Sequence, residues 1–255
     1  MTTATLPMRP PKTLLRQVGR AIADFHMIRA NDRVLVGVSG GKDSLALLHV
    51  LIHLKRHAPV SFDLAAVTID PQVEGFDPSP LKDYMRELGM KYYYQSQPIM
   101  QRAVHHMGNN SYCSFCSRMK RGIMYATARR EGYNVLALAQ HLDDLAESFL
   151  MSAFHGGQLR TMKASYTNDD GDLRIVRPLI YARERQTESF AREAQLPVIG
   201  DNCPACFTMP TQRQHMKELL AEEEKRNKYL FKNLLTTMKP LLNQEYYVRN
   251  SDMKM

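Results

Sequence analysis

The sequence lacks tryptophan, has only four cysteines, and contains no apolar run near the ~20 residues needed to cross a bilayer. Its most apolar helical stretch, residues 45–54, is interrupted by His49 and His53. Residues 1–11 lack the apolar segment of a secretory signal. Hydrophobic residues at 44% and charged residues at 24% exclude a disordered or low-complexity chain. We therefore expect a cytoplasmic, globular protein with no membrane partner.

Positive charge exceeds negative charge in the 255 residues: 34 Lys and Arg face 26 Asp and Glu, giving a net charge of +8. A basic protein of this size often binds a polyanion, but many basic enzymes do not. Charge alone therefore leaves nucleic acid as an open candidate partner.

Short apolar runs typical of buried parallel strands alternate with helical patterns along the chain. The expected strands cover 34–38, 64–69, 92–94 and 135–139. The expected helices cover 14–25, 45–54, 80–88, 118–131, 143–154, 184–195 and 211–235. Residues 168–172 predict a turn between short strands. This alternation predicts an α/β, Rossmann-like parallel sheet with helices on both faces and a ligand site beyond the carboxyl ends of the strands.

The domain organisation follows from the same pattern. We expect a mobile N-terminal segment and amphipathic helix in 1–30 and the nucleotide-binding α/β domain in 31–200. Residues 201–255, with a cysteine pair and a basic helix, are expected to pack on that domain.

The loop after the first strand is the most informative segment, Ser39-Gly40-Gly41-Lys42-Asp43-Ser44. Its glycines let backbone N–H groups approach a ligand, and the next helix points its positive end at the loop. Two hydroxyls and one lysine add donors suited to a pyrophosphate. A Walker A loop is excluded, since Val36 and Asp43 stand where that motif has Gly and Ser or Thr. The competing interpretation is a glycine-rich turn that binds nothing.

This loop resembles the signature of the PP-loop ATP pyrophosphatases. The resemblance implies an adenine nucleotide alpha hydrolase-like fold that binds ATP, adenylates a carbonyl-like oxygen and releases pyrophosphate, after which a nucleophile displaces AMP. ATP brings Mg²⁺, which we assign to Asp43 and one of Asp143 and Asp144. Adjacent acids at a helix start are also common dipole partners. Asp70 ends the second strand, where the superfamily contacts adenosine, although a capping role competes.

Four cysteines form two Cys-x-x-Cys pairs, Cys113 with Cys116 and Cys203 with Cys206. In a reducing cytosol such pairs more often bind metal or react than form structural disulfides. The residues alone leave a four-cysteine zinc site, an iron–sulfur cluster and a disulfide or persulfide relay open. Two unrelated structural thiol pairs are the remaining interpretation.

Further motifs occur in one order along the chain: Cys113-x-x-Cys-Ser-Arg-x-x-Arg-Gly122, His141-Leu-Asp-Asp144, Phe154-His-Gly-Gly157, Arg177-Pro-Leu179, and Cys203-Pro-Ala-Cys206 followed by Gln212-Arg213. Together they resemble the tRNA 2-thiocytidine biosynthesis proteins (the TtcA family). One departure is Gln140, which stands where the family has histidine.

The resemblance implies an ATP-dependent tRNA sulfurtransferase that 2-thiolates a cytidine at position 32 of tRNA. It also implies a [4Fe-4S] cluster on Cys113, Cys116 and Cys203, with Cys206 a bystander or fourth ligand. Lys120 takes the place of a catalytic lysine in related tRNA thiolases, and tRNA phosphate binding is its alternative role.

The partners implied are tRNA and a sulfur donor, such as a cysteine desulfurase or sulfide, and a homodimer stays open. The rival enzyme acts on another base such as uridine, or uses a persulfide relay. A zinc-stabilised nucleotide- or RNA-binding protein without catalysis is the third interpretation. The basic residues of 217–232 are interleaved with glutamates, which favours a salt-bridged surface helix.

Overall fold

The computed structural model describes residues 8–99, 101–102, 112–200 and 212–243. Six strands form one sheet in the order β3-β2-β1-β4-β6-β5. Their bounds are β1 Arg33–Gly37, β2 Asp63–Asp70, β3 Tyr92–Ser96, β4 Val135–Ala137, β5 Ser165–Thr167 and β6 Arg174–Val176. Every pair in this sheet is parallel except β5 with β6, which is antiparallel. The expected α/β fold is confirmed, and the short edge strand β5 departs from a wholly parallel sheet.

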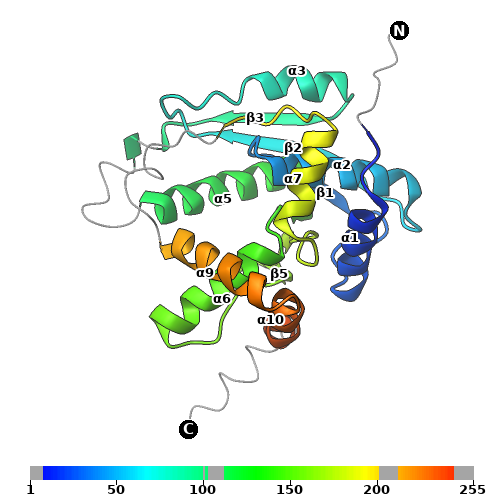
Figure 1. Ribbon diagram of the computed structural model, residues 1–255. Helices are drawn as coiled ribbons and strands as arrows, with labels where there is room; N and C mark the ends of the chain where they lie inside the picture. Colours follow the sequence, from blue (N-terminus) through cyan, green and yellow to red (C-terminus); the bar gives the residue numbers. More distant parts are fainter. Residues whose placement is uncertain (1–7, 100, 103–111, 201–211, 244–255) are drawn as a thin grey trace.

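Helices cover both faces of this sheet (Figure 1). Their bounds are α1 Lys12–Asp24, α2 Lys42–His57, α3 Pro80–Glu87, α5 Tyr112–Glu131, α6 Leu142–Gly156, α7 Glu184–Glu193, α9 Gln212–Arg226 and α10 Leu230–Met238, followed by a 3-10 turn, Lys239–Leu242. Within the described ranges, no helix is long and apolar enough to span a membrane.

Strand β1 shows why both faces are apolar. Val34 and Val36 enter the larger core with α1, α2 and α6, whereas Leu35 enters the second core beneath α5. Successive side chains of a strand point to opposite faces, so a central strand covered on both sides needs an uninterrupted apolar run. Gly37 ends this strand, and a Cβ there would lie 3.1 Å from the Met124 sulfur of α5. The sheet and α5 are therefore in close contact beside the loop of residues 39–44, which is called the phosphate loop below.

Two helix predictions need correction. The helix expected over 211–235 is two helices, because α9 ends at Arg226 and α10 begins at Leu230. Between them the Asn227 side chain accepts a hydrogen bond from the Tyr229 N–H at 3.0 Å, a local turn that competes with the helix. Helix α5 begins at Tyr112, so Cys113 and Cys116 lie within its first turns and not before it.

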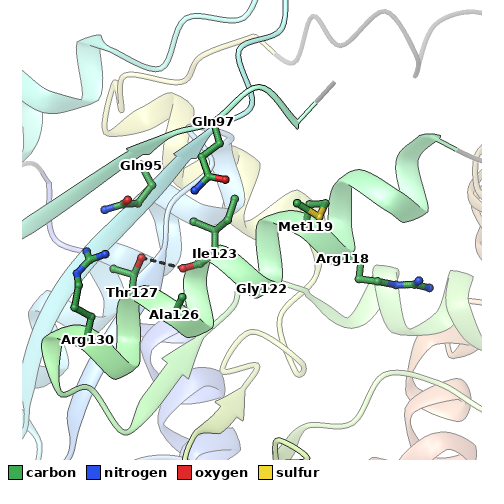
Figure 2. A pocket seen from close by; sticks show the side chains of 9 residues that line it. All are labelled: Gln95, Gln97, Arg118, Met119, Gly122, Ile123, Ala126, Thr127 and Arg130. Atoms are coloured by element: carbon green, nitrogen blue, oxygen red, sulfur yellow. Dashed lines mark hydrogen bonds between the residues drawn. The ribbon is translucent and has the colours of Figure 1, made fainter. Parts of the chain in front are cut away.

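A pocket of about 250 Å³ lies between α5 and the carboxyl end of β3 (Figure 2). Its lining residues are Gln95, Gln97, Arg118, Met119, Gly122, Ile123, Ala126, Thr127 and Arg130. None of these lining residues is acidic and two are arginines, while most of the exposed lining surface is apolar.

Candidate functional site

The phosphate loop joins β1 to α2 and is closed by its own hydroxyls. The Ser39 N–H donates to Ser44 Oγ at 3.2 Å, and Ser44 Oγ donates to the Gly41 carbonyl at 2.8 Å. Gly41 is the N-cap of α2, and no side chain caps that end of the helix. The first N–H groups of a helix have no intrahelical partner, so this end is suited to an anion.

Gly40 is required by both backbone and packing. Its φ is +93°, and a Cβ there would lie 3.1 Å from the Ile199 side chain. The Ile199 N–H also donates to the Gly40 carbonyl at 2.9 Å. The segment that follows α7 therefore lies directly against the phosphate loop.

Lys42 is held between two carboxylates. Its Nζ lies 3.0 Å from Asp43 Oδ2 and 2.9 Å from Glu184 Oε1. Burial acts to lower the pKa of Lys42, but the hydrogen bond and charge of Glu184, together with those of Asp43, raise it to about 12. This lysine therefore stays positively charged at the mouth of the loop.

Glu184 connects Lys42 to a second lysine. Its Oε2 lies 2.7 Å from the Nζ of Lys217 on α9. Burial acts to raise the pKa of Glu184, but hydrogen bonds from Lys217 and Lys42 outweigh it and lower the pKa to about 2. The phosphate loop is thus tied electrostatically to α7 and α9.

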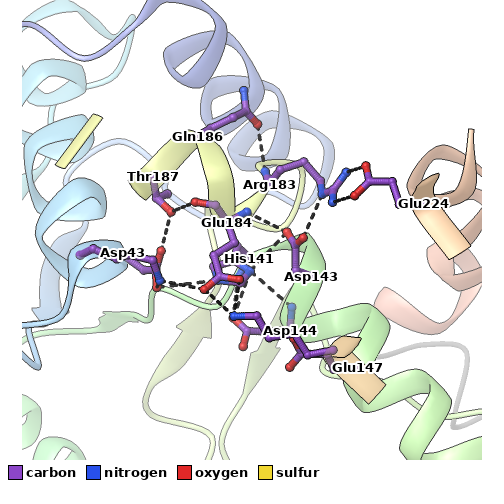
Figure 3. Close-up of polar contacts among 12 residues, drawn as sticks. Asp43, His141, Asp143, Asp144, Glu147, Arg183, Glu184, Gln186, Thr187 and Glu224 are labelled. Atoms are coloured by element: carbon purple, nitrogen blue, oxygen red, sulfur yellow. Dashed lines mark hydrogen bonds and ion pairs between the residues drawn. The ribbon is translucent and has the colours of Figure 1, made fainter. Parts of the chain in front are cut away.

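His141 gathers the predicted carboxylates (Figure 3). It is 4% exposed and caps α6, where its Nδ1 accepts a hydrogen bond from the Asp144 N–H at 3.3 Å. The His141 N–H donates in return to Asp144 Oδ2 at 3.0 Å. The Nε2 atom faces Asp43 Oδ2 at 3.7 Å. The sequence placed this histidine in a motif but gave it no role, and the fold makes it the link between the phosphate loop and α6.

The two adjacent aspartates differ in their partners. Asp143 Oδ1 accepts from Arg183 Nε at 3.0 Å, and its Oδ2 accepts from the Glu184 N–H at 2.7 Å. Asp144 keeps Oδ1 only 3.6 Å from the exposed guanidinium of Arg213. Both carboxylate oxygens of Asp143 are therefore hydrogen-bonded within the protein. Asp144 Oδ1, in contrast, lies near one exposed guanidinium and can accept a further ligand.

Arg183 holds the C-terminal helices to this site. Its guanidinium pairs in a fork with Glu224 at 2.6 and 2.8 Å and lies 3.2 Å over the ring of Phe231. The contact connects α9 and α10 to Asp143 through one side chain.

Glu147 is a titratable residue that the sequence analysis missed. It lies one turn beyond Asp144 on α6, is 4% exposed, and pairs with Arg213 at 3.5 Å. Burial raises its pKa to about 7. The three-residue spacing from Asp144 is the sequence signal that could have found it, because such residues share a helix face.

Asp43 completes its contacts with Thr187, whose hydroxyl donates to Oδ1. Among the described residues, no group of three or more His, Cys, Asp and Glu side chains is arranged to hold a metal ion. A divalent cation at these carboxylates would therefore have to arrive with its own phosphate and water ligands.

Of the four predicted cysteine ligands, Cys116 is half-buried beside the second core. Cys113 precedes it by three residues in the first turns of α5, so the two positions share one helix face. The side chain of Cys113 and the whole of Cys203 and Cys206 lie outside the described residues. The four-cysteine prediction thus stays a prediction.

Asp70 is occupied by its neighbours. Its carboxylate accepts hydrogen bonds from Tyr94 Oη at 2.8 Å, Ser96 Oγ at 3.0 Å and the Gln72 N–H at 2.8 Å. These contacts fit the capping interpretation, and the adenosine contact stays a prediction.

Lys120 is half-buried on α5, with Nζ 6.0 Å from the centroid of the Phe76 ring. This contact places its ammonium toward the loop that follows β2. Gln140, the departure from the family pattern, accepts a hydrogen bond from Arg177 Nε at 3.0 Å. Arg177 is buried and also donates to the Lys163 carbonyl at 2.6 Å, so Gln140 orients a buried cation beside the site.

Comparison with known proteins gives a consistent result. The PP-loop domain family matches residues 12–223. The chain is 43% identical over 229 residues to the tRNA-cytidine(32) 2-sulfurtransferase of Geobacter sulfurreducens, covering 89% of both chains. It is 42% identical to the enzyme of the same name from Geobacter metallireducens, covering 87% of this chain and 86% of that one.

The fold is shared with a solved tRNA thiolase structure. The U34-tRNA thiolase NcsA from Methanococcus maripaludis, determined with its [4Fe-4S] cluster, superposes with a TM-score of 0.74 and 21% sequence identity. The match covers 91% of this chain and 78% of that one.

Proposed function

The chain belongs to the PP-loop tRNA-cytidine(32) 2-sulfurtransferases, and on this premise we propose that it uses ATP to activate a tRNA cytidine and replaces the 2-oxygen with sulfur. One observation carries the proposal. The phosphate loop, the charged Lys42 and the carboxylates around His141 lie together at one edge of the sheet.

The first step is adenylation. The O2 atom of cytidine attacks the α-phosphorus of ATP, a P–O bond forms, and pyrophosphate leaves. The N–H groups at the start of α2 and the Lys42 ammonium stabilise the negative charge of the departing phosphates. The step turns the poor leaving group at C2 into AMP.

Mg²⁺ accompanies the nucleotide, and its protein ligands are proposed to be Asp43 and Asp144. Asp143 is less suited than Asp144, since both Asp143 oxygens accept hydrogen bonds from Arg183 and the Glu184 N–H, whereas Asp144 Oδ1 has only the 3.6 Å contact with Arg213. We assign Asp143 to positioning, because it joins the start of α6 to the start of α7. His141 holds Asp144 in place through the reciprocal cap of α6.

The second step forms a C–S bond at C2 as the C–O bond to AMP breaks. Cys113, Cys116 and Cys203 are the proposed ligands of a [4Fe-4S] cluster, which when bound supplies the sulfur-delivery chemistry. Soft thiolates suit iron, and Cys113 and Cys116 share one face of α5. Lys120 stabilises charge on the reacting base from the same helix.

The proposed enzyme works in the cytoplasm and receives sulfur from a cysteine desulfurase or from sulfide. The alternatives are another base such as uridine, or a persulfide relay that uses one cysteine from each pair.

Metal analysis of protein purified without oxygen tests the proposal, together with mass spectrometry of tRNA after reaction with ATP and sulfide. We expect about four iron and four sulfide per chain, lost in Cys113→Ala and Cys203→Ala but retained in Cys206→Ala. The tRNA product is expected to be 2-thiocytidine at position 32.

Stoichiometric zinc without iron would contradict the cluster. Thiolation of uridine instead of cytidine would contradict the substrate. Thiolation that stops in Cys206→Ala with iron intact would favour the persulfide relay.

A further inference from the structure

One part of the cysteine motif has no role in the proposed reaction: Arg118, Arg121 and Gly122 on α5. All three are exposed, and residues three and four apart lie on the same helix face. Lys120 lies on the opposite side of the helix, half-buried toward Phe76. The helix therefore presents one lysine inward and two arginines outward.

The two arginines differ from the other arginines of α5 in their partners. Among the described residues, neither Arg118 nor Arg121 forms an ion pair with a carboxylate. Further along α5, Arg129 pairs with Asp172 at 2.6 Å and Arg130 pairs with Glu131 at 2.8 Å.

The basic residues of α9 are also neutralised. Lys217 pairs with Glu184, Lys225 with Glu222 at 2.9 Å, and Arg226 with Glu222 and Glu223. Charge therefore favours α5 over α9 as the surface for a polyanion.

Gly122 gives an independent indication. It lies in the middle of α5, where glycine is a poor helix former. A Cβ at this position would meet nothing within 4 Å, so packing inside the described protein does not require glycine. Ala126, which follows Gly122 by four residues on the same helix face, is exposed and also small. A strip of small residues between Arg118 and Arg130 lets an extended chain approach the helix backbone closely.

The pocket beside this strip has hydrogen-bond donors among its lining side chains. Figure 2 shows Arg118 and Arg130 toward its two ends, Gly122 between them, and the carboxamides of Gln95 and Gln97 on the strand opposite. Guanidinium and amide donors recognise phosphate and ribose oxygens. The pocket of about 250 Å³ has no carboxylate in its lining to repel them.

We propose that Arg118, Arg121 and Gly122 form the surface that binds the sugar–phosphate backbone of the tRNA anticodon arm. Arg118 follows Cys116 by two residues, so a strand held here lies beside the cysteine end of α5. The inference rests on the proposed function, since it assumes that tRNA is the substrate.

Binding of fluorescently labelled, unmodified tRNA to the full chain, purified without oxygen, tests this surface across a range of salt concentrations. In Arg118→Ala/Arg121→Ala we expect affinity to fall at least about tenfold and the slope of log K against log salt to fall by about 1.5. The matched control is Lys225→Ala/Arg226→Ala, which removes two cations that are already paired and should leave both quantities near the wild-type values.

Gly122→Ala tests close approach of the tRNA backbone to α5 without changing the charge of the protein. It should raise the melting temperature, because alanine favours the helix, and yet weaken tRNA binding about tenfold. Gly19→Ala is the matched control, since Gly19 lies in α1 and a Cβ there also meets nothing within 4 Å. That variant should gain stability with tRNA affinity unchanged.

Binding of a fluorescent ATP analogue reports on the phosphate loop and should be unchanged in all four variants. Equal losses of tRNA affinity in the two double variants, or full affinity in Gly122→Ala, would overturn the proposed surface. Loss of ATP binding in Arg118→Ala/Arg121→Ala would overturn it too, by showing that these arginines support the fold. Wild-type protein that binds ATP but no tRNA would instead refute the proposed function, and this inference with it.

Discussion

Single side chains decide the electrostatics of the site, and Glu184 is the clearest case. It accepts from Lys42 of α2 and from Lys217 of α9, which are 142 and 33 positions away in the sequence. No local sequence pattern predicts these partners, because they lie on different helices and meet only when the helices pack together. The sequence predicted Lys42 and the carboxylates Asp43 and Asp144, which belong to continuous motifs. It did not predict Glu184, Arg183 or Glu147, which act through partners on other elements.

Replacing Glu184 by glutamine should lower the free energy of unfolding by about 1 to 3 kcal/mol at pH 7, since two charged hydrogen bonds are lost. The pKa of Glu184 is depressed to about 2 in the folded protein, so its stabilisation is present above pH 4.5 and declines as pH falls below that value. Urea denaturation from pH 7 to pH 3.5 measures the difference. Glu188→Gln, an exposed change on the same helix, is the control. A difference from wild type that stays constant with pH would contradict the prediction.

Glu147 should act in the opposite direction. Burial raises its pKa to about 7, so the folded state favours the protonated carboxyl, and its contribution to stability is complete below pH 4.5 and lost as pH rises to 7. Relative to Glu147→Gln, the wild-type protein should therefore lose stability across that window. Denaturation of both proteins at several pH values checks this, and parallel pH curves would disprove it.

At the scale of elements, the sequence predicted whether a segment is a helix or a strand better than it predicted where a helix is interrupted. The buried strands were predictable because both faces of the sheet exclude water and demand apolar runs. The break between α9 and α10 was not, because Asn227 and Tyr229 carry no strong helix-breaking signal and the turn depends on one side-chain hydrogen bond. The antiparallel pairing of β5 with β6 follows from the chain reversal at residues 168–172, which the sequence did predict as a turn between short strands.

The phosphate loop offers a comparison between neighbouring glycines. Gly40→Ala should destabilise the protein by about 1 to 3 kcal/mol, because it forces a side chain into a left-handed conformation and against Ile199. Gly41 has φ of −73°, and a Cβ there would lie 3.4 Å from Ser39 Oγ, an ordinary contact. Gly41→Ala should therefore stay within about 0.5 kcal/mol of wild type. Chemical denaturation measures both variants, and equal effects would argue against the special role of Gly40.

At the scale of the whole molecule, the C-terminal helices share the core of the sheet domain. Phe231 and Met238 of α10 belong to the same buried cluster as Leu14 of α1 and Leu45 of α2. Arg183 adds a polar connection through Glu224. The shared core predicts cooperative unfolding.

We expect one unfolding transition for the entire chain. Tyrosine near-ultraviolet circular dichroism, which has no tryptophan signal to obscure it, should change at the same denaturant concentration as the far-ultraviolet signal. Arg183→Met should lower the stability by about 3 kcal/mol, because Glu224 and Asp143 lose the partly buried cation that they share, with the transition still single. Separate melting of the C-terminal helices would show that they form an independent unit.

The pairing of Lys42 with Asp43 and Glu184 has a consequence for how ligands are selected. A loop whose lysine is already neutralised does not attract every small anion, because an incoming ligand must exchange with a carboxylate that is already in place. A monovalent anion gains little by such an exchange. A polyphosphate offers several charges to one lysine and to the open start of α2 at once, and Glu184 retains Lys217 when it releases Lys42. The ion pairs of Lys42 therefore select ligands with several negative charges over monovalent anions, before any contact with the base is made.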